Sequence, residues 1–407
     1  MIRILNFKDA QPLIQRKTVR LEEAERVVAP ILAAVRARGD AALLEYARKF
    51  DNFDGPTVRI PVEGSLSPDF QRAVTTAANN IREYAQSQLP RERTVNYADG
   101  RRLGQIVRPL DSMAAYIPAG RYPLPSTLLM TVIPAQVAGV ATICVACPHP
   151  SREILGLAKW LGVTHFFRMG GAQAIAALAY GTETVPKVDR IVGPGNIYVA
   201  AAKKLIAGEV GIDFVAGPTE IVIIASDADP RWLAADMLAQ AEHDVDASSI
   251  LLTTSRPLAE RVAAEIDRQL ASLPTAAVAR ESIANNGAIV IVDALDRAVE
   301  FSNALAPEHL SLHDPHLLPS IRHAGSVFLR AWSPEAAGDY ASGPNHVLPT
   351  SGAARLRGGL SAADFVKVIS VQELTPAGLA KLTPAIATLA RAEGLEAHAR
   401  SVEVRSA

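Results

Sequence analysis

The chain has 407 residues, 49% of them apolar and 20% charged, which is typical of a globular protein with two or three domains. The 41 Lys and Arg residues nearly balance the 42 Asp and Glu residues, giving a net charge of -1, so the charge favours neither nucleic acid nor an anionic membrane as a partner. Two cysteines exclude a disulfide framework and favour a reducing compartment, by default the cytoplasm, and no apolar run is long enough to predict a membrane span.

The first part of the chain has mainly helical patterns. Residues 21–50 predict two helices divided at Gly39 and Asp40, because Gly commonly ends a helix and Asp caps the next one. An amphipathic helix is expected over 68–89. Short strands are then expected near 105–109 and 114–118.

From there on, short apolar runs alternate with helical segments. The predicted strands are 141–147, 165–168, 190–192, 220–225, 249–254 and 288–292, and the predicted helices are 151–161, 172–180, 196–206, 231–243, 258–273 and 294–304. This alternation is typical of parallel sheets covered by helices on both faces. The predicted fold class is therefore α/β.

The last quarter of the chain begins with an irregular segment. Residues 332–360 are rich in Gly, Ser and Pro and show no hydrophobic period. A segment of this kind inside a compact chain usually has a function. Residues 361–391 are predicted to return to helix, and 392–407 form a polar tail.

Gln240 and His243 are polar residues on the apolar face of a predicted helix. Leu233 and Met237 define that face, Gln240 follows at the same spacing, and His243 is its neighbour. Polar groups on such a face need partners, and the last turn of a helix favours a positive charge. A divalent cation would fit there, but the spacing alone favours a hydrogen-bonded pair that caps the helix, since Gln is an uncommon metal ligand.

Glu308 and His309 are adjacent, directly after Pro307 and before a predicted strand. Glu and His together form the usual proton-transfer pair near neutral pH. Adjacent strand residues point to opposite faces, so both side chains reach one site only at the strand end or in the loop. The alternative is a surface Glu beside a partly buried His.

Two other carboxylate and imidazole pairs occur later in the chain. Asp339 and His346 lie in the irregular segment, where a flexible loop is the alternative interpretation. Glu393 and His398 lie in the polar tail and would, on their own, be interpreted as solvated residues.

Two glycine turns connect a predicted strand to a predicted helix. They are Gly170-Gly171-Ala172-Gln173 and Gly193-Pro194-Gly195-Asn196. Each could bring backbone amides to a phosphate, but neither has the G-x-G-x-x-G spacing of a dinucleotide fingerprint, and tight packing explains them equally. Cys144 and Cys147 lie along a predicted buried strand, where structural thiols are expected.

Together, these segments closely resemble the histidinol dehydrogenase family over nearly the whole chain. The resemblance rests on the order and combination of motifs at 116–120, 170–182, 193–198, 216–220, 240–243, 306–310, 333–349 and 393–398. It implies two incomplete Rossmann-like domains with parallel sheets, one inserted in the other, and small N- and C-terminal dimerisation segments. The expected division is 1–20 for the N-terminal segment, 21–115 with 221–360 for the substrate and zinc domain, 116–220 for the inserted NAD-binding domain, and 361–407 for the C-terminal helical segment and tail.

The resemblance also implies the roles of individual residues. The expected zinc ligands are Gln240, His243, Asp339 and His398, and the expected acid/base residues are Glu308 and His309. The expected substrate contacts are Thr219, Gln240, His243, His309, Asp339, His346, Glu393 and His398. The positions that match those holding NAD are Tyr116, Gln173 and Asn196. Thr219 carries a methyl group more than the Ser that it replaces, and Asp244 stands where some members have Gly.

The implied activity is oxidation of L-histidinol to L-histidine through a bound L-histidinal, with reduction of two NAD, in a homodimer with shared active sites and one zinc ion per subunit. His309 would act as the base and Glu308 would activate water. Related enzymes use the same zinc site on other polar alcohols, so such a dehydrogenase stays open as an alternative. A zinc hydrolase and a non-catalytic binding protein are the alternatives from other classes.

Overall fold

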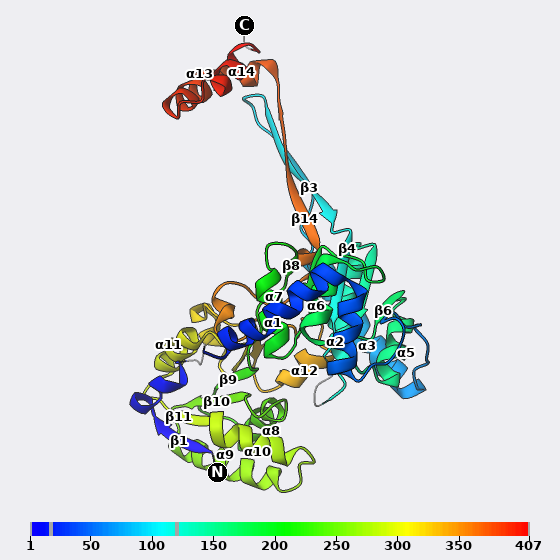
Figure 1. Ribbon diagram of the computed structural model, residues 1–407. Helices are drawn as coiled ribbons and strands as arrows, with labels where there is room; N and C mark the ends of the chain where they lie inside the picture. Colours follow the sequence, from blue (N-terminus) through cyan, green and yellow to red (C-terminus); the bar gives the residue numbers. More distant parts are fainter. Residues whose placement is uncertain (1, 16–18, 119–121, 406–407) are drawn as a thin grey trace.

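The computed structural model describes residues 2–15, 19–118 and 122–405. These residues form two α/β units and a narrow arm that projects from them (Figure 1). Ala119 and Gly120 of the first expected motif lie outside the described residues, as do Met1 and residues 16–18 of the expected N-terminal segment. Within the described part of the chain, no helix combines the length and the apolar character needed to cross a bilayer.

One unit is built on a six-stranded parallel sheet in the order β1-β11-β10-β9-β12-β13. Its strands are β1 (Arg3–Asn6), β9 (Glu220–Ile224), β10 (Ser248–Thr253), β11 (Ala288–Ile291), β12 (His309–Leu312) and β13 (Ser326–Leu329). Its helices are α8 (Pro230–Ala241), α9 (Arg256–Leu270), α10 (Ala276–Asn286) and α11 (Leu295–Leu305). Along β9, Ile221 and Ile223 pack under α8 and α9, whereas Val222 and Ile224 pack toward α11. Burial on both faces explains the continuous apolar strands.

The other unit is built on a five-stranded parallel sheet in the order β6-β5-β4-β7-β8. Its strands are β4 (Ser112–Tyr116), β5 (Thr142–Ala146), β6 (His165–Phe167), β7 (Arg190–Val192) and β8 (Gly211–Ile212). One face is covered by α1 (Val19–Arg38), α2 (Asp40–Asp51), α6 (Gly171–Tyr180) and α7 (Ile197–Ile206). The other face is covered by α3 (Pro68–Gln88), α4 (Pro125–Ala138) and α5 (Arg152–Trp160).

Both sheets have the Rossmann strand order. When the strands of each unit are counted along the chain from β9 and from β4, the spatial order is third, second, first, fourth, fifth. The six-stranded sheet adds β1 at its edge. The α/β fold class and the two Rossmann-like units are therefore confirmed.

The packing corrects the expected division of the chain in two places. Residues 21–115 were expected to join 221–360, but α1 and α2 pack on the five-stranded sheet, where Val28, Leu32 and Val35 meet α6 and α7. The segment 1–20 was expected to stand apart, but its β1 is a strand of the six-stranded sheet. The physical reason is that an apolar helix face or a short strand indicates burial without indicating which sheet buries it.

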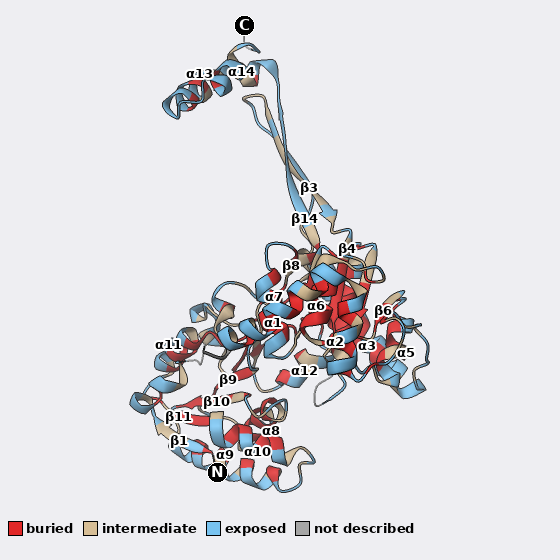
Figure 2. Ribbon diagram, in the orientation of Figure 1, coloured by how far each residue is buried: buried red, intermediate tan, exposed pale blue. Residues whose placement is uncertain are grey.

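The arm is a three-stranded antiparallel sheet, which the sequence analysis did not predict. Its strands are β2 (Arg93–Asn96), β3 (Arg101–Pro109) and β14 (Val366–Leu374), and its end carries α13 (Pro376–Ala392) and α14 (Glu396–Glu403). The helix expected over 361–391 is thus wrong for 366–374, where β-branched residues favour a strand. Most of the arm is exposed (Figure 2).

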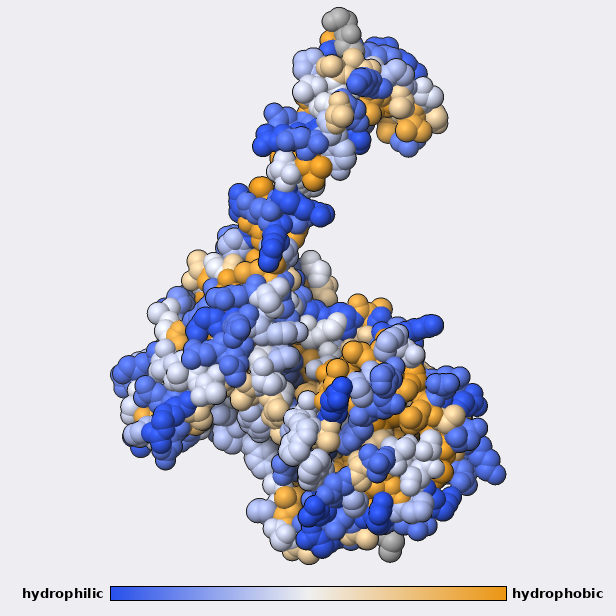
Figure 3. All heavy atoms as spheres, turned by 180° about the vertical axis from the view of Figure 1, so that it is seen from behind, coloured by the Kyte–Doolittle hydropathy of each residue, from blue (hydrophilic) through white to orange (hydrophobic). Residues whose placement is uncertain are grey.

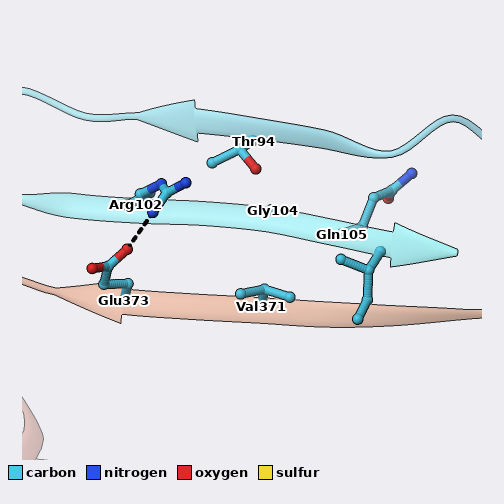
Figure 4. Close-up of a pocket in the computed structure, with 7 residues that line it drawn as sticks. Thr94, Arg102, Gly104, Gln105, Val371 and Glu373 are labelled. Carbon is cyan, nitrogen blue, oxygen red and sulfur yellow. Dashed lines mark hydrogen bonds and ion pairs between the residues drawn. The ribbon is translucent and has the colours of Figure 1, made fainter.

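Close contact between the arm's strands leaves only a shallow pocket between their side chains (Figure 4). Gly104 permits this contact, since a side chain there would collide with the backbone at Arg93. Arg102 Nη1 lies 2.7 Å from Glu373 Oε2 across the pair β3 and β14. These contacts join β2 and β14 to β3 along the arm.

The irregular segment 332–360 contains one short α-helix, α12 (Glu335–Tyr340). Short 3-10 helices lie at Phe7–Asp9, Gln11–Leu13, Pro315–Ser320, Ala353–Arg355 and Ala362–Phe365. The break predicted at Gly39 is confirmed: α1 ends at Arg38, α2 begins at Asp40, and Gly39 has a φ of 52°.

Candidate active site

Glu308 and His309 lie at the amino end of β12, beside the amino end of β9. This end of the sheet is opposite to the one at which Rossmann-type sheets usually bind ligands. Because the pair is at the strand end, both side chains reach one site, which resolves the geometrical question left open by the sequence. Both are buried, with 6% of Glu308 and 3% of His309 exposed.

A chain of hydrogen bonds fixes the Glu308 carboxylate. Thr219 Oγ1 donates to Glu308 Oε2 at 2.5 Å, and the backbone amide of Glu220 donates to the same oxygen at 3.0 Å. Gln240 Nε2 in turn donates to Thr219 Oγ1 at 2.8 Å. Burial raises the pKa of Glu308 above its ordinary value, against the effects of His309 and these donors. Glu308 is therefore a fixed carboxylate with more basicity than an exposed one.

The carboxamide oxygen of Gln240 is buried and has no hydrogen-bond partner among the described residues. Its amide nitrogen is committed to Thr219, so the oxygen must face the other way. A buried carbonyl oxygen without a partner is costly unless something else satisfies it. A metal ion would satisfy it, which fits the expected role of Gln240 as a ligand.

His243 and Asp339 lie close together, with His243 Nε2 3.9 Å from Asp339 Oδ2. His243 follows α8 directly, and Asp339 lies on α12, which packs against α8. Ligand atoms of His243, Asp339 and Glu335 all lie within 4.8 Å of one another, close enough to hold one metal ion. Glu335 was not predicted from the sequence, although its spacing of four before Asp339 puts both on one helix face.

His309 is surrounded by carboxylates. Its Nδ1 lies 3.3 Å from the carbonyl oxygen of Glu220 and 3.7 Å from both Glu308 Oε2 and Glu335 Oε1, and its Nε2 lies 3.7 Å from Asp339 Oδ1. Burial lowers the pKa of His309, but the charges of Glu335, Glu308 and Asp339 outweigh it and raise the pKa to about 10. A cation bound at Asp339 would oppose this rise.

His346 connects the two units. Its Nδ1 donates to the carbonyl oxygen of Asp339 at 2.8 Å, and its Nε2 lies 3.3 Å from the Thr127 hydroxyl on α4 of the five-stranded unit. Burial lowers the pKa of His346. The two contacts of the His346 ring hold the α12 segment against the other unit.

Glu393 and His398 do not join the cluster at Glu308, His309 and Asp339 within the chain. Glu393 follows α13 and His398 lies in α14, both at the far end of the arm (Figure 1). The other expected ligands and acid/base residues come together at the amino ends of β9 and β12. Two expected substrate contacts, of which His398 is also an expected zinc ligand, therefore stand apart from the rest.

The expected NAD positions lie at the carboxyl end of the five-stranded sheet. Tyr116 ends β4, and its hydroxyl accepts from the Gly171 amide at 3.1 Å; burial raises its pKa. Gln173 is buried in the first turn of α6, and Asn196 caps α7 by accepting from two backbone amides. They surround β4 and β7, where the strand order reverses, which is the usual cofactor position in such sheets.

A buried ion pair fixes the turn between β7 and α7, a feature that the sequence analysis missed. Lys203 pairs with Asp213, and each of the two side chains also binds the backbone of Gly193. Lys203 Nζ donates to the Gly193 carbonyl oxygen at 3.0 Å, and the Gly193 amide donates to Asp213 at 2.8 Å. Gly193 has a φ of 114°, and a side chain there would collide with the Tyr116 carbonyl oxygen. The turn is therefore rigid and tight against β4.

Comparison with known proteins decides the family. The histidinol dehydrogenase family model matches residues 14–406. This chain belongs to the histidinol dehydrogenase family. It is 48% identical to the histidinol dehydrogenase of Geobacter metallireducens over 94% of this chain and 92% of that protein. It is 45% identical to that of Halalkalibacterium halodurans over 99% of both.

A solved structure agrees with this assignment. The crystal structure of histidinol dehydrogenase from Elizabethkingia anophelis superposes with a TM-score of 0.94 at 36% identity, covering 99% of this chain and 98% of that one. The resemblance inferred from the motifs is confirmed, and the protein is an oxidoreductase of histidine biosynthesis.

Proposed function

We propose that this enzyme oxidises L-histidinol to L-histidine through a bound L-histidinal, with two NAD as acceptors and one zinc ion per subunit. The observation that supports this most directly is the cluster at the amino ends of β9 and β12. It joins a proton-transfer pair, Glu308 and His309, to the metal-ligand set of Gln240, His243 and Asp339.

The donor set fits zinc. Gln240 Oε1, His243 Nε2 and an Asp339 oxygen would be the ligands from this chain, and the Gln240 oxygen is the buried atom without a partner among the described residues. Zinc imposes little geometry of its own and accepts nitrogen and oxygen ligands. When bound, it would supply a positive charge that orients substrate nitrogens and offsets the surrounding carboxylates.

The carboxyl end of the five-stranded sheet fits NAD. Tyr116, Gln173 and Asn196 would hold the cofactor at the point where the strand order reverses. When bound, NAD would supply the acceptor for the hydride that leaves the substrate carbon. Rigid backbone at Gly193 supports a fixed position for it.

His309 is the proposed base in both oxidation steps. Its Nδ1 faces the Glu220 carbonyl oxygen, which can only accept, so the proton stays on Nδ1 and Nε2 is the nitrogen that takes protons. Nε2 would remove the proton from the alcohol as the first hydride leaves. It would act again on the aldehyde hydrate as the second hydride leaves.

Glu308 is the proposed base for the water that adds to the aldehyde. Burial raises its pKa, which makes the carboxylate a stronger base than an exposed one. Thr219 and Glu220 bind one of its oxygens, which leaves the other oxygen to accept from water. The carboxylates around His309 also favour a cationic amino alcohol over a neutral one.

A homodimer with shared sites would bring the missing ligand. His398 and Glu393 lie at the end of the arm, which cannot fold back while β14 is paired with β3 along nine residues. The arm exposes apolar side chains that favour association, including Val371 at 43%, Leu389 at 65% and Val404 at 72%. Figure 3 shows apolar side chains among polar ones at its end. His398 from a second copy would then complete the zinc site.

The cytoplasm is the proposed location. Cys144 and Cys147 are both free and buried, and burial raises the pKa of each thiol to about 12. Such thiols are structural and need no oxidising compartment.

The test of the proposed function is a stoichiometric turnover. The zinc-loaded enzyme is given a limiting amount of L-histidinol with excess NAD, and NADH and L-histidine are counted. Two NADH for each histidine, with no aldehyde in solution, is the expected result. One NADH for each histidinol, or better turnover of another polar alcohol, would instead indicate a related dehydrogenase.

A further inference from the structure

Asp51, the last residue of α2, is a buried carboxylate next to the expected cofactor turn. It is 5% exposed. Its Oδ2 accepts from the Gly170 backbone amide at 3.0 Å and from Gln173 Nε2 at 3.1 Å. Asp51 lies 119 residues before Gly170 in sequence. The contact between helix α2 and the turn from β6 to α6 is therefore a tertiary contact.

This contact sets the orientation of the Gln173 side chain. An ionised carboxylate can only accept hydrogen bonds, so Gln173 must turn its amide nitrogen to Asp51. The carboxamide oxygen of Gln173 then lies on the opposite side, close to Gly171. A Cβ added to Gly171 would lie 2.9 Å from this oxygen. The Gly171 amide donates to the Tyr116 hydroxyl, so one short turn joins two of the three expected NAD positions.

Gly170 packs closely against Pro148 and Asp51. A Cβ on Gly170 would lie 2.7 Å from Pro148 and 3.0 Å from Asp51 Oδ1. Both backbone amides of the glycine pair are bound by side chains, Gly170 to Asp51 and Gly171 to Tyr116. Asp51 therefore constrains the backbone and a side chain at the same place.

We propose that Asp51 is a positioning residue for NAD, acting through Gln173 and the Gly170 amide rather than by touching the cofactor. The inference rests on the proposed function, in which Tyr116, Gln173 and Asn196 hold NAD. It assigns to α2, from the N-terminal part of the chain, a role in the affinity for the cofactor.

The experiment measures NADH binding to the zinc-loaded enzyme by the fluorescence of the bound nicotinamide, without turnover. Asp51→Ala removes the acceptor for two donors, and we expect the dissociation constant to rise about tenfold. Asp51→Asn is expected to stay within about threefold of the wild type, because both bonds end on one oxygen and a carboxamide oxygen can replace it. Asp54→Ala, an exposed residue of the same type nearby, is the matched control.

Gln173→Ala distinguishes a failure of the proposed NAD site from a failure of the positioning role of Asp51. Weaker NADH binding in Gln173→Ala is expected, and in the double variant Asp51→Ala/Gln173→Ala the two losses should be less than additive, because Asp51 acts partly through Gln173. Wild-type NADH binding in Gln173→Ala would overturn the proposed cofactor site itself. Weaker binding in Gln173→Ala with wild-type binding in Asp51→Ala would overturn only the positioning role.

Two other results would also contradict the positioning role. One is a loss in Asp51→Asn as large as that in Asp51→Ala, which would mean that charge rather than hydrogen bonding matters. The other is an equal rise in the KM for histidinol at saturating NAD, which would indicate a general structural defect. If Asp51→Ala does not fold, Asp51→Ser, which is too short to reach both donors but can hold water, takes its place with the same expected results.

Discussion

The two parallel sheets share one strand order but present their candidate functional residues at opposite ends. In the five-stranded sheet, Tyr116 and the Gly193 turn follow the carboxyl ends of β4 and β7. In the six-stranded sheet, Thr219 and Glu308 precede the amino ends of β9 and β12. The strand order thus predicts the position of one site and not of the other. The strand order alone is therefore not enough to locate a site, which has to be argued from the particular residues at each sheet end.

The two ends also differ in charge. At the five-stranded sheet, the buried Asp213 is neutralised by Lys203, and Asp51 binds amides. At the six-stranded sheet, Glu308, Glu335 and Asp339 surround one imidazole, and the pKa of Glu335 is raised to about 8, mainly by burial. Several buried carboxylates close together repel one another, and a bound cation would offset this repulsion. The metal is therefore expected at the six-stranded sheet alone.

Removing the metal should give the largest effect. Prolonged chelation should reduce histidinol turnover to background, while circular dichroism and NADH binding stay close to those of the loaded enzyme. The reason is that a chain of this length has cores that do not depend on one ion. Full activity in rigorously metal-free protein would disprove the zinc site.

Glu308→Gln should separate the two oxidation steps. The Gln oxygen can accept from both Thr219 and Glu220, so the local structure should hold, but the side chain can no longer take a proton from water. We expect oxidation of supplied histidinal to slow by about 10²-fold or more, with a much smaller effect on the first hydride transfer from histidinol, measured in a single turnover. Equal losses in both steps would show that Glu308 has another role.

The candidate site was predictable where residues cluster locally. The helix spacing of Gln240 and His243 and the adjacency of Glu308 and His309 are both local sequence patterns that indicate chemistry. The pairing of β12 with β9 then decides which sheet end they occupy. Glu335 was missed because an acidic residue in a segment without a hydrophobic period gives no sign that it will be buried.

The fold was predictable where the pattern is local and not where it depends on distant partners. The alternation of strands and helices predicted both parallel sheets. The arm was not predicted, because β14 pairs with β3, more than 200 residues earlier in the chain, and such a partner cannot be read from a local pattern. For the same reason, the sequence did not indicate that α1 covers the five-stranded sheet.

Hybrid dimers should test whether the arm completes the site at the six-stranded sheet. The inactive variants His243→Ala and His398→Ala are unfolded and refolded together, with differently tagged subunits to confirm exchange. In a hybrid, one site combines the intact pocket of the His398→Ala chain with the intact arm of the other. Half of the dimers should be hybrids with one good site of two, so about a quarter of wild-type activity should return. Activity that stays at background despite exchange would refute the shared site.

Asp236→Asn should give the smallest effect, on stability. Asp236 lies on α8 one turn before Gln240, and burial raises its pKa from 3.8 to about 6. The folded protein thus holds this proton more tightly than the unfolded chain, so stability falls as the pH rises through this window and stays reduced above it. In metal-free protein, Asp236→Asn should raise the free energy of unfolding at pH 7 by about 1–2 kcal/mol.

Urea denaturation at pH 4 and at pH 7 measures this change. The gain should be largely absent at pH 4, where the wild-type carboxyl is mostly protonated in the folded state. A gain of equal size at both pH values would mean that burial of the charge is not its cause.

We propose that the two sheets have different roles: the six-stranded sheet carries the catalytic residues, and the five-stranded sheet binds the cofactor. The most direct test compares His309→Asn with Gln173→Ala, measuring for each both the turnover of histidinol at saturating NAD and the dissociation constant of NADH. His309→Asn should lose about 10²–10⁴-fold in turnover and bind NADH as the wild type does. Gln173→Ala should bind NADH more weakly and keep most of its turnover at saturating NAD. Loss of NADH binding in His309→Asn, or wild-type NADH binding in Gln173→Ala, would contradict this division.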